Sequence, residues 1–498
     1  MVFSSLLFLF RFLPITFLIY YLVPFRFKNT VLFLASLFFY TWGEPKFFPV
    51  MLISIGVNYV AGLLMERYDQ RPQLRRICFW LAFAITLGFL LFFKYTNFFV
   101  GNINALFGTS LPLLSSTEFH LPLGISFYTF QILAYTIDVY RRKIKVEHNL
   151  IDFGAFVVLF PQLIAGPIVL YPDISKEMKH RTITLAQVEE GVGLFIMGLG
   201  SKILLADTVG ALWTEVQTLG FANVSTPLAW MGLLAYTFQI YFDFSGYSLM
   251  AIGLGRMLGF YFPQNFNYPY ISKSITEFWR RWHITLSSWF RDYVYIPLGG
   301  NRVKRSRQFF NIFVVWFLTG FWHGAAWNFI FWGLYFFVLL MIEKSFLLKH
   351  LEKSRVLSHI YLIFLVMLGW ALFAISDLST LGELFGRLFS LKGGIDGRVK
   401  ALEEQLADRD AEEAVELALK SGKITPAQKE WAKGYALKSP DGFKSFLEKA
   451  PQVVPMSEVA GGETLALKGK KPDEATMLIC KQLGVSAEDL EKYGTKEE

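Results

Sequence analysis

The stretch that decides the fold is ITEFWRRWHITLSSWFRDYVYIPLGGNR at 275–302, followed after a short basic connector by FLTGFWHGAAWNFIFWG at 317–333. The second part lies inside an apolar run over 309–342. One helix needs only about 20 apolar residues to cross a bilayer, so this run is too long for a single crossing. We therefore expect two membrane helices that meet between Gly320 and Gly324.

The whole chain is apolar enough for a polytopic membrane protein. Of its 498 residues, 54% are hydrophobic, whereas soluble domains have about 45–50%, and the excess is gathered in long runs. Its two cysteines, Cys78 and Cys480, are too few for a disulfide framework and show no metal-binding spacing. The sequence contains no HExxH zinc motif, no GxSxG nucleophile elbow and no Walker loop. We therefore expect no metal site.

Charge divides the chain into two modules. Residues 391–498 carry 17 Lys and Arg against 20 Asp and Glu, a net charge of −3, and the whole chain has +8, which leaves +11 for residues 1–390. We expect a membrane domain over 1–390 and a separate charged, helical and partly loose tail over 391–498. Basic short loops fix the orientation of a membrane domain, so the positive charge requires no nucleic-acid partner.

Apolar runs alternate with loops along the membrane domain. Up to about residue 150 every second loop is basic, and the positive-inside rule makes these loops cytoplasmic and places residue 1 and loop 101–121 outside. The predicted fold class is therefore all-α, a polytopic membrane helix bundle. The apolar runs are 5–23, 30–42, 47–65, 77–100, 122–139, 188–214, 227–260, 309–342 and 356–376.

One further apolar segment is interrupted. Residues 153–172 contain Pro161, Gly166 and Pro167, which break a helix before it reaches the length of a span. We expect a re-entrant or broken element here, which is tolerated at membrane depth only where protein buries it. Residues 188–214 carry repeated glycines instead, and small residues allow close packing of helices.

An amphipathic helix is expected over 276–293. Its apolar residues recur with helical spacing, and Arg280, Arg281 and Arg291 fall on the opposite side. Such a helix can lie in the membrane interface. His283 lies on it, and we expect this histidine to shape the cytoplasmic mouth of a site and to support a deeper histidine.

His323 is the deeper histidine. It lies in a stretch that is otherwise apolar or small, about 21 Å along the helix axis from Phe309. The bilayer core is about 30 Å thick, so His323 is expected well inside it. An ionisable side chain at this depth indicates a functional site. The alternative is a hydrogen-bonded histidine that serves packing.

Asp243, in the run YTFQIYFDFSGYS, is another ionisable residue among aromatic ones. A buried aspartate is costly unless partners satisfy it. The sequence leaves two roles open, a structural hydrogen-bonding centre and a catalytic acid. Its candidate partners are Tyr241, Ser245 and Tyr247. Nearby, Lys202 and Asp207 are expected to form an interfacial ion pair.

The pair FWRRWHITLSSWFRDYVYIPLGGNR and FWHGAAWNFIFWG resembles the membrane-bound O-acyltransferase family, and within it the bacterial alginate O-acetyltransferase type. The opening MVFSSLLFLFRFLPI and the run YFDFSGYS agree, and the similarity covers about residues 1–390. The resemblance implies a many-helix bundle with re-entrant pieces. It further implies that His323 is the catalytic intramembrane histidine and that His283 occupies its partner position.

The resemblance also implies acyl transfer to a hydroxyl without a bound cofactor. The donor would be acetyl-CoA or an acyl-carrier thioester that reaches the histidine from the cytoplasm. In the alginate-type branch, the acetyl group passes to periplasmic SGNH-type esterase-like partner proteins that modify an exopolysaccharide. The location implied is the bacterial inner membrane.

This chemistry suits the residues. Histidine titrates at about pH 6.5, and a neutral imidazole accepts a proton from a hydroxyl nucleophile. Trp327 and Asn328 are candidate donors for the oxyanion that develops during transfer from a thioester. Three basic side chains are candidates for holding the phosphates of coenzyme A or, alternatively, for plain anchoring in the interface. They are Arg280, Arg281 and Arg291.

The tail resembles the C-terminal part of Mu-like phage I proteins, which are protease and scaffold proteins, on the run GKITPAQKEWAKGYALKSPDGFKSFLEKAP. We expect helices over 397–420, 424–433, 442–450 and 475–493, and a loose linker over 451–474. The tail stands where the family continues with further spans, so an inactive fusion is one alternative function. D-alanyl transfer from a carrier protein and a membrane transporter with broken helices are the others.

Overall fold

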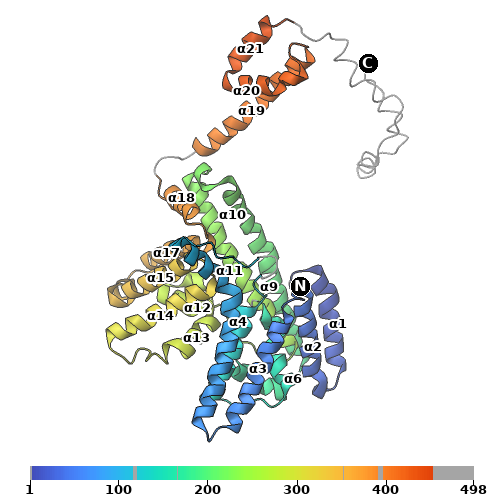
Figure 1. Cartoon of the computed structure of the whole chain (residues 1–498), viewed down its shortest axis with the longest axis vertical. Helices are drawn as coiled ribbons and strands as arrows, with labels where there is room; N and C mark the ends of the chain where they lie inside the picture. The colour runs from blue at the N-terminus through green and yellow to red at the C-terminus, as the bar shows by residue number, and fades with distance from the viewer. Residues whose placement is uncertain (1–2, 116–119, 165, 352, 391–395, 452–498) are drawn as a thin grey trace, which may run out of the picture. The chain divides into compact units, whose positions relative to one another are not determined.

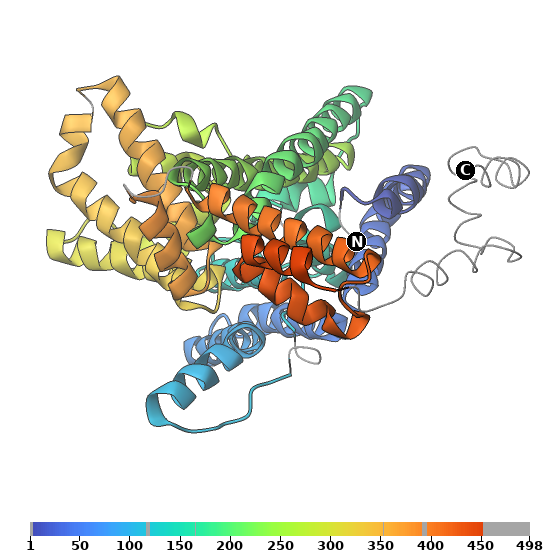
Figure 2. The same ribbon diagram turned by 90° about the horizontal axis from the view of Figure 1, so that it is seen from above.

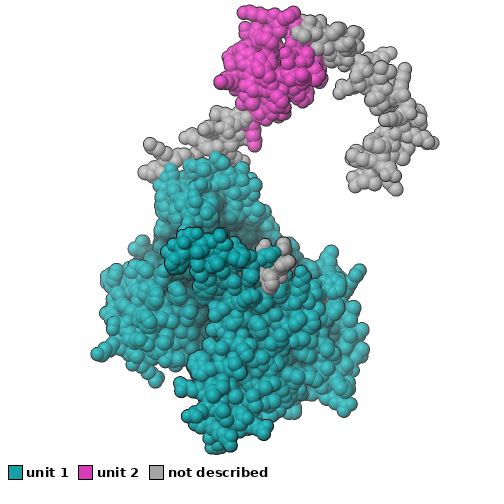
Figure 3. Space-filling model, viewed as in Figure 1, with its two compact units in different colours: residues 1–394 teal, residues 395–498 magenta. Residues whose placement is uncertain are grey.

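The computed structural model describes residues 3–115, 120–164, 166–351, 353–390 and 396–451. The chain forms two compact units, residues 1–394 and 395–498 (Figure 3), divided close to the boundary expected after residue 390. Every regular element in the described residues is a helix, which confirms the predicted all-α fold.

The first unit is a bundle of α-helices (Figure 1). They are α1 (Leu13–Leu22), α2 (Phe25–Gly43), α3 (Phe48–Arg67), α4 (Pro72–Phe107), α5 (Ile125–Tyr140), α6 (Leu150–Val158), α7 (Phe160–Leu163), α8 (Tyr171–Lys179), α9 (Leu185–Gly200), α10 (Asp207–Leu219), α11 (Thr226–Met257), α12 (Ile275–Arg281), α13 (Ile284–Phe290), α14 (Arg305–His323), α15 (Trp327–Ile342), α16 (Leu348–Leu351), α17 (Arg355–Ala374) and α18 (Leu378–Leu388). Short π-helical segments continue some of them, at η1 (Phe8–Phe12), η2 (Ser201–Ala206), η5 (Arg291–Tyr295) and η6 (Glu343–Leu347).

Five helical stretches among the described residues are long and apolar enough to cross a membrane. They are Phe48–Arg67, Pro72–Phe107, Leu185–Leu219, Trp327–Leu351 and Arg355–Ala374. The second of them, α4, continues beyond the apolar run expected at 77–100, so the outer loop expected over 101–121 begins later. Figure 2 shows the light-blue end of α4 and the segment after it at the margin of the unit.

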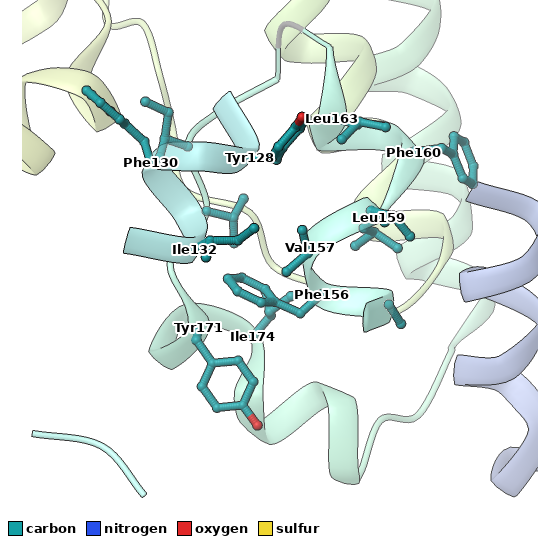
Figure 4. Packing of buried hydrophobic residues seen from close by; sticks show 14 of the residues in the cluster. Tyr128, Phe130, Ile132, Phe156, Val157, Leu159, Phe160, Leu163, Tyr171 and Ile174 are labelled. Carbon is teal, nitrogen blue, oxygen red and sulfur yellow. The ribbon is translucent and has the colours of Figure 1, made fainter. Parts of the chain in front are cut away.

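The broken element lies against α5 in the interior. All residues of α5 except Phe127 and Tyr140 are buried. The expected interruption of 153–172 is confirmed, because the chain forms α6, then the single turn α7, and then α8. Phe156 and Leu163 of this element pack in one apolar cluster with Ile132 of α5 (Figure 4). Protein therefore buries the non-helical backbone, as membrane depth requires.

Glycines bring α9 and α11 into close contact. A Cβ atom on Gly191 would lie 2.6 Å from the carbonyl oxygen of Gly253, and one on Gly253 would lie 2.5 Å from that of Gly191. Gly198 and Gly246 meet in the same way two turns further along. Backbone cannot move aside as a flexible side chain does, so any larger residue forces the helices apart. The predicted role in close packing is confirmed for Gly191 and Gly198, whereas a Cβ on Gly193 or Gly200 would have no atom within 4 Å.

The single amphipathic helix expected over 276–293 is wrong. The chain forms α12 and α13 with a break at Trp282 and His283, and His283 has φ 45°, in the left-handed region. The backbone of this break is fixed from outside the segment, since Ile284 N–H donates to the carbonyl of Asn265 at 2.9 Å. The turn aims His283 inward instead of along an interfacial helix.

The expected division of 309–342 is confirmed, with α14 ending at His323 and α15 beginning at Trp327. Gly320 and Gly333 allow the two helices to approach closely, because a Cβ on either would collide with backbone of the other helix. Trp332 and Phe336 of α15 pack with Trp370 of α17 in a further apolar cluster. This packing fixes the end of α14, and with it the position of His323.

The second unit contains α19 (Asp396–Lys420), α20 (Lys429–Lys438) and α21 (Pro440–Lys449). Its apolar core includes Val415, Ala432 and Phe443. The predicted helices over 397–420, 424–433 and 442–450 correspond to these elements. The predicted linker and the last predicted helix lie outside the described residues.

Candidate active site

A cavity of about 420 Å³ opens between the helices of the first unit. Helices α4, α5, α11, α14, α15 and α17 contribute to its wall, together with the break between α12 and α13. Most of the lining is aromatic or aliphatic. The polar side chains in the wall are Lys94, Ser126, Asp243, Tyr247, His283 and His323. The fold thus brings two histidines that are far apart in sequence to one apolar cavity.

His323 is the last residue of α14, and its ring is half-buried. Aromatic rings surround it, with ring centroids 5.0 Å away for Trp332 and 5.3 Å away for Phe373, both nearly perpendicular to the imidazole. Neither ring nitrogen forms a hydrogen bond within the described part of the chain. The aromatic walls hold the ring while leaving both nitrogens free for a substrate.

His283 is held more firmly. Its side chain is 2% exposed, and its ring lies perpendicular to Phe244 at 4.8 Å. Its Nδ1 lies 3.2 Å from Oδ1 of Asn265, whereas its buried Nε2 has no hydrogen-bond partner among the described residues. The ring centroid of Trp322 lies 6.3 Å from that of His283 and 5.0 Å from that of His323, so one indole neighbours both imidazoles.

Asn265 fixes the protonation pattern of His283. Its Oδ1 also accepts from Thr285, from the hydroxyl at 2.9 Å and from the backbone N–H at 3.3 Å. A backbone N–H can only donate, so the shared atom is an oxygen and Nδ1 of His283 carries the proton. Nδ2 of Asn265 in turn donates to Ser248 at 3.0 Å. The unpartnered Nε2 of His283 is therefore the nitrogen that can accept a proton.

Two polar residues of the cavity, Lys94 and Ser126, are absent from the sequence-based predictions. Lys94 is the only charged residue in the apolar run 77–100, and a lone charge at membrane depth is itself a signal of function. Ser126 carries no such signal, because its place in the cavity depends on how α5 packs. Asn265 and Thr285 were missed for the same reason.

The three arginines expected at a donor site do not line this cavity. Arg281 pairs with Glu277 one turn earlier at 2.9 Å, and Arg291 pairs with the adjacent Asp292 at 2.7 Å. Arg280 is exposed and forms no hydrogen bond or ion pair with the described residues. These contacts leave Arg280 as the arginine most available for an anionic ligand.

Trp327 and Asn328, expected near the oxyanion, also lie outside the cavity wall. Trp327 is 47% exposed and donates from Nε1 to Asn102 at 2.9 Å. Asn328 is buried and donates to the carbonyl oxygens of Leu372 and Phe373 at the end of α17, at 3.2 and 3.3 Å. The structure thus places both side chains in contacts between helices.

Asp243 lines the cavity but does not bond to its expected neighbours on α11. It pairs with Lys202 of η2 at 3.0 Å, and Lys202 also contacts Asp207 at 2.6 Å. The expected ion pair of Lys202 and Asp207 is confirmed, with Asp243 as a third member. Half of the Asp243 side chain is exposed, so its charge is satisfied without burial.

The cavity therefore combines two imidazoles that can be neutral, a cation, a carboxylate and two hydroxyls within an apolar wall. Such a set suits proton transfer between a hydroxyl and a carbonyl compound where water is largely excluded. The chain belongs to the membrane-bound O-acyltransferase family, whose model matches residues 78–376. It is a membrane acyltransferase, and both histidines fall within the matched range.

Several curated proteins are similar to this chain. The probable alginate O-acetylase AlgI of Azotobacter vinelandii is 44% identical over 394 residues, which cover 78% of this chain and 78% of that protein. The peptidoglycan O-acetyltransferase of Helicobacter pylori is 34% identical over 432 residues, covering 79% of this chain and 80% of that protein. A teichoic acid D-alanyltransferase of Streptococcus thermophilus is 31% identical over 264 residues, covering 49% and 62%.

Proposed function

We propose that this chain is an O-acetyltransferase that supplies acetyl groups for an exported polysaccharide such as alginate. The observation that carries the proposal is the placement of His283 and His323 in the wall of one apolar cavity. The relatives support the choice of acyl group, since the two with the greatest coverage quoted above are named for O-acetylation. The proposed location is the bacterial inner membrane.

In this proposal His323 is the general base. His323 lines the cavity, where a hydroxyl acceptor and the carbonyl of an acyl thioester meet. The neutral imidazole takes the hydroxyl proton while the oxygen attacks the carbonyl carbon. His283 lines the same cavity with its Nδ1 occupied by Asn265, and in this proposal its Nε2 orients the acceptor or relays the proton.

The proposed donor is acetyl-CoA or an acyl-carrier thioester that approaches from the cytoplasm. Arg280 is the proposed contact for its phosphates, because guanidinium groups bind phosphate well and Arg281 and Arg291 already have carboxylate partners. On the other side, Leu121, the last residue of the loop predicted to lie outside, lines the cavity. Periplasmic SGNH-type partner proteins are the proposed next acceptors of the acetyl group.

The test is acetylation of the exported polysaccharide in cells that produce His323→Ala. We expect acetyl esters in the polymer to disappear while the variant protein is still present in the membrane fraction. His350→Ala is the matched control, because His350 is exposed and its ring hydrogen-bonds to the carbonyl of Phe346 one turn earlier, at 3.0 Å. Retained acetylation in the His323 variant would contradict the proposal, as would equal loss in both variants.

D-alanyl transfer to a cell-wall polymer is the second candidate, supported by the similarity to the teichoic acid D-alanyltransferase. It requires the same base and the same cavity, so His323→Ala does not separate the two. Mass analysis of the ester groups on the polymer does, since acetyl and alanyl esters differ in mass and only the latter carries an amine.

A further inference from the structure

Lys94 occupies an unusual position for a cation. It lies on α4, in the wall of the cavity that contains His323. Its Nζ donates to the carbonyl oxygen of Trp322 and to Oγ of Ser126 at 3.3 Å, and it lies 5.5 Å from the Trp322 ring. No carboxylate pairs with it in the part of the chain that the structure describes. A charge in a membrane helix is expensive unless it is paired or used.

The contact with Trp322 does not by itself require a charge. The final carbonyl groups of a helix lack partners within it, and α14 ends at His323. Lys94 satisfies the carbonyl of Trp322, and the neighbouring Tyr95 satisfies that of Phe321 through its hydroxyl while stacking on the Phe321 ring at 4.0 Å. Tyr95 shows that a neutral donor suffices to cap this helix end.

The Lys94 ammonium group has more N–H bonds than it has partners in the described residues. A lysine ammonium group carries three N–H bonds, and the structure uses two of them, for Trp322 and Ser126. Asp243, the carboxylate in the same wall, is already paired with Lys202. One N–H of Lys94 therefore remains for a ligand in the cavity.

We propose that Lys94 is the oxyanion-binding residue of this acyltransferase, donating to the carbonyl oxygen of the acyl group beside His323. The inference rests on the proposed function, because it assigns a role at the same site. The acceptor hydroxyl attacks the thioester carbonyl carbon, its proton moves to His323, and the C=O electron pair moves to the oxygen held by Lys94. Collapse restores C=O and breaks the C–S bond, and His323 returns the proton to the departing sulfur, which leaves as a thiol.

A fixed cation serves this step better than a neutral donor. The carbonyl oxygen gains a full charge only in the tetrahedral intermediate, so a cation binds that state more tightly than the ground state. The apolar wall strengthens the interaction because it lowers the local dielectric around the partly buried Lys94. The Lys94 charge should therefore raise kcat and leave the KM for the donor nearly unchanged.

The experiment compares Lys94→Gln and Lys94→Met with Tyr95→Phe in the full-length protein in proteoliposomes, using acetyl-CoA as donor. Glutamine keeps a neutral donor for the Trp322 carbonyl, and Tyr95→Phe removes only the other capping hydrogen bond. We expect kcat to fall by about 10²–10³-fold in both Lys94 variants, the magnitude for loss of one oxyanion donor, with KM for the donor little changed. Tyr95→Phe removes one helix-end hydrogen bond worth about 1 kcal/mol, so its kcat should fall by no more than about fivefold.

Slow hydrolysis of the donor by water provides the second readout. An oxyanion donor serves any nucleophile, so hydrolysis should fall in the Lys94 variants by the same factor as transfer. Any of three results would overturn the inference. Lys94→Gln could keep the wild-type kcat, or Lys94→Gln and Tyr95→Phe could lose kcat equally. The Lys94 variants could also change only the KM for an acceptor that carries a carboxylate. His323→Ala is measured alongside, and wild-type transfer by that variant would contradict the proposed function instead.

Discussion

Replacing Asn265 with leucine should remove the hydrogen bond that holds the ring of His283 in place. Leucine is close to asparagine in size, but it removes the oxygen that accepts from His283 and twice from Thr285, and the amide that donates to Ser248. Asn265 is 1% exposed, so water cannot replace these bonds. The variant thus leaves polar groups of the cavity wall without partners.

Two of the groups left without a partner have no other acceptor among the described residues, namely Nδ1–H of His283 and the backbone N–H of Thr285. Each buried donor left unsatisfied costs about 1–3 kcal/mol, so the free energy of unfolding should fall by about 2–6 kcal/mol. Nδ1 of His283 also loses the partner that keeps its proton there, and the ring is free to turn or change tautomer. A misplaced acid–base group costs about 10²–10⁴-fold in rate.

Asn265→Asp is the informative comparison. It keeps the acceptor oxygen, and the Ser248 hydroxyl can turn to donate to the carboxylate, so stability should be largely restored. The added negative charge favours the protonated form of His283, so activity should be lowest at acidic pH and recover as pH rises.

The assay is thermal unfolding in detergent combined with acetyl transfer from acetyl-CoA between pH 5.5 and 8.5, a range of about one to two units on either side of the histidine value. The expected order of activity at neutral pH is wild type, Asn265→Asp, Asn265→Leu. A leucine variant that transfers acetyl groups at the wild-type rate would refute the assignment of a supporting role to Asn265.

Three further predictions concern the scaffold. Gly253→Val should prevent the close approach of α9 and α11 and lower the free energy of unfolding by about 1–3 kcal/mol. Gly193→Val should not, because its added Cβ has no atom within 4 Å. Equal losses of thermal stability in the two variants would contradict the packing argument. Burial alone would raise the pKa of Glu147, but the hydrogen bond from Lys179 and others hold this pKa below its ordinary 4.5. Its carboxylate thus stabilises the fold above pH 4.5, and Glu147→Gln should lower the melting temperature at pH 7 but progressively less as pH falls below 4.5; a pH-independent difference would contradict this. Removing residues 395–498 should leave acetyl transfer unchanged, because every residue of the cavity wall lies in the first unit; loss of transfer by an inserted truncated protein would contradict this.

Local rules of sequence predicted much of the bundle. The length of the run over 309–342 required a break, and the glycines near it located that break at the end of α14. The prolines of 153–172 predicted the broken element in the same way. In each case the determinant is a property of the segment itself.

The geometry of the site depends on contacts between residues far apart in sequence, which local sequence patterns cannot predict. Apolar residues recur with helical spacing throughout 276–293, yet the chain turns at His283 because Asn265, distant in sequence, holds both its ring and the following backbone. Lys94 appeared to be one charge in a span, and only its contact with Trp322 places it beside His323. The arginines looked available in sequence, and the structure gives Arg281 and Arg291 carboxylate partners.

The central claim is that His283 and His323 act on one acyl group in one cavity, and a double-mutant kinetic cycle tests it most directly. The measurement is the single-turnover rate of acetyl transfer by His283→Ala, His323→Ala and the double variant in proteoliposomes. Residues that act as a unit are strongly non-additive, so the double variant should be no slower than His323→Ala alone. Rate losses that multiply in the double variant, or a His283 variant as fast as wild type, would contradict the claim.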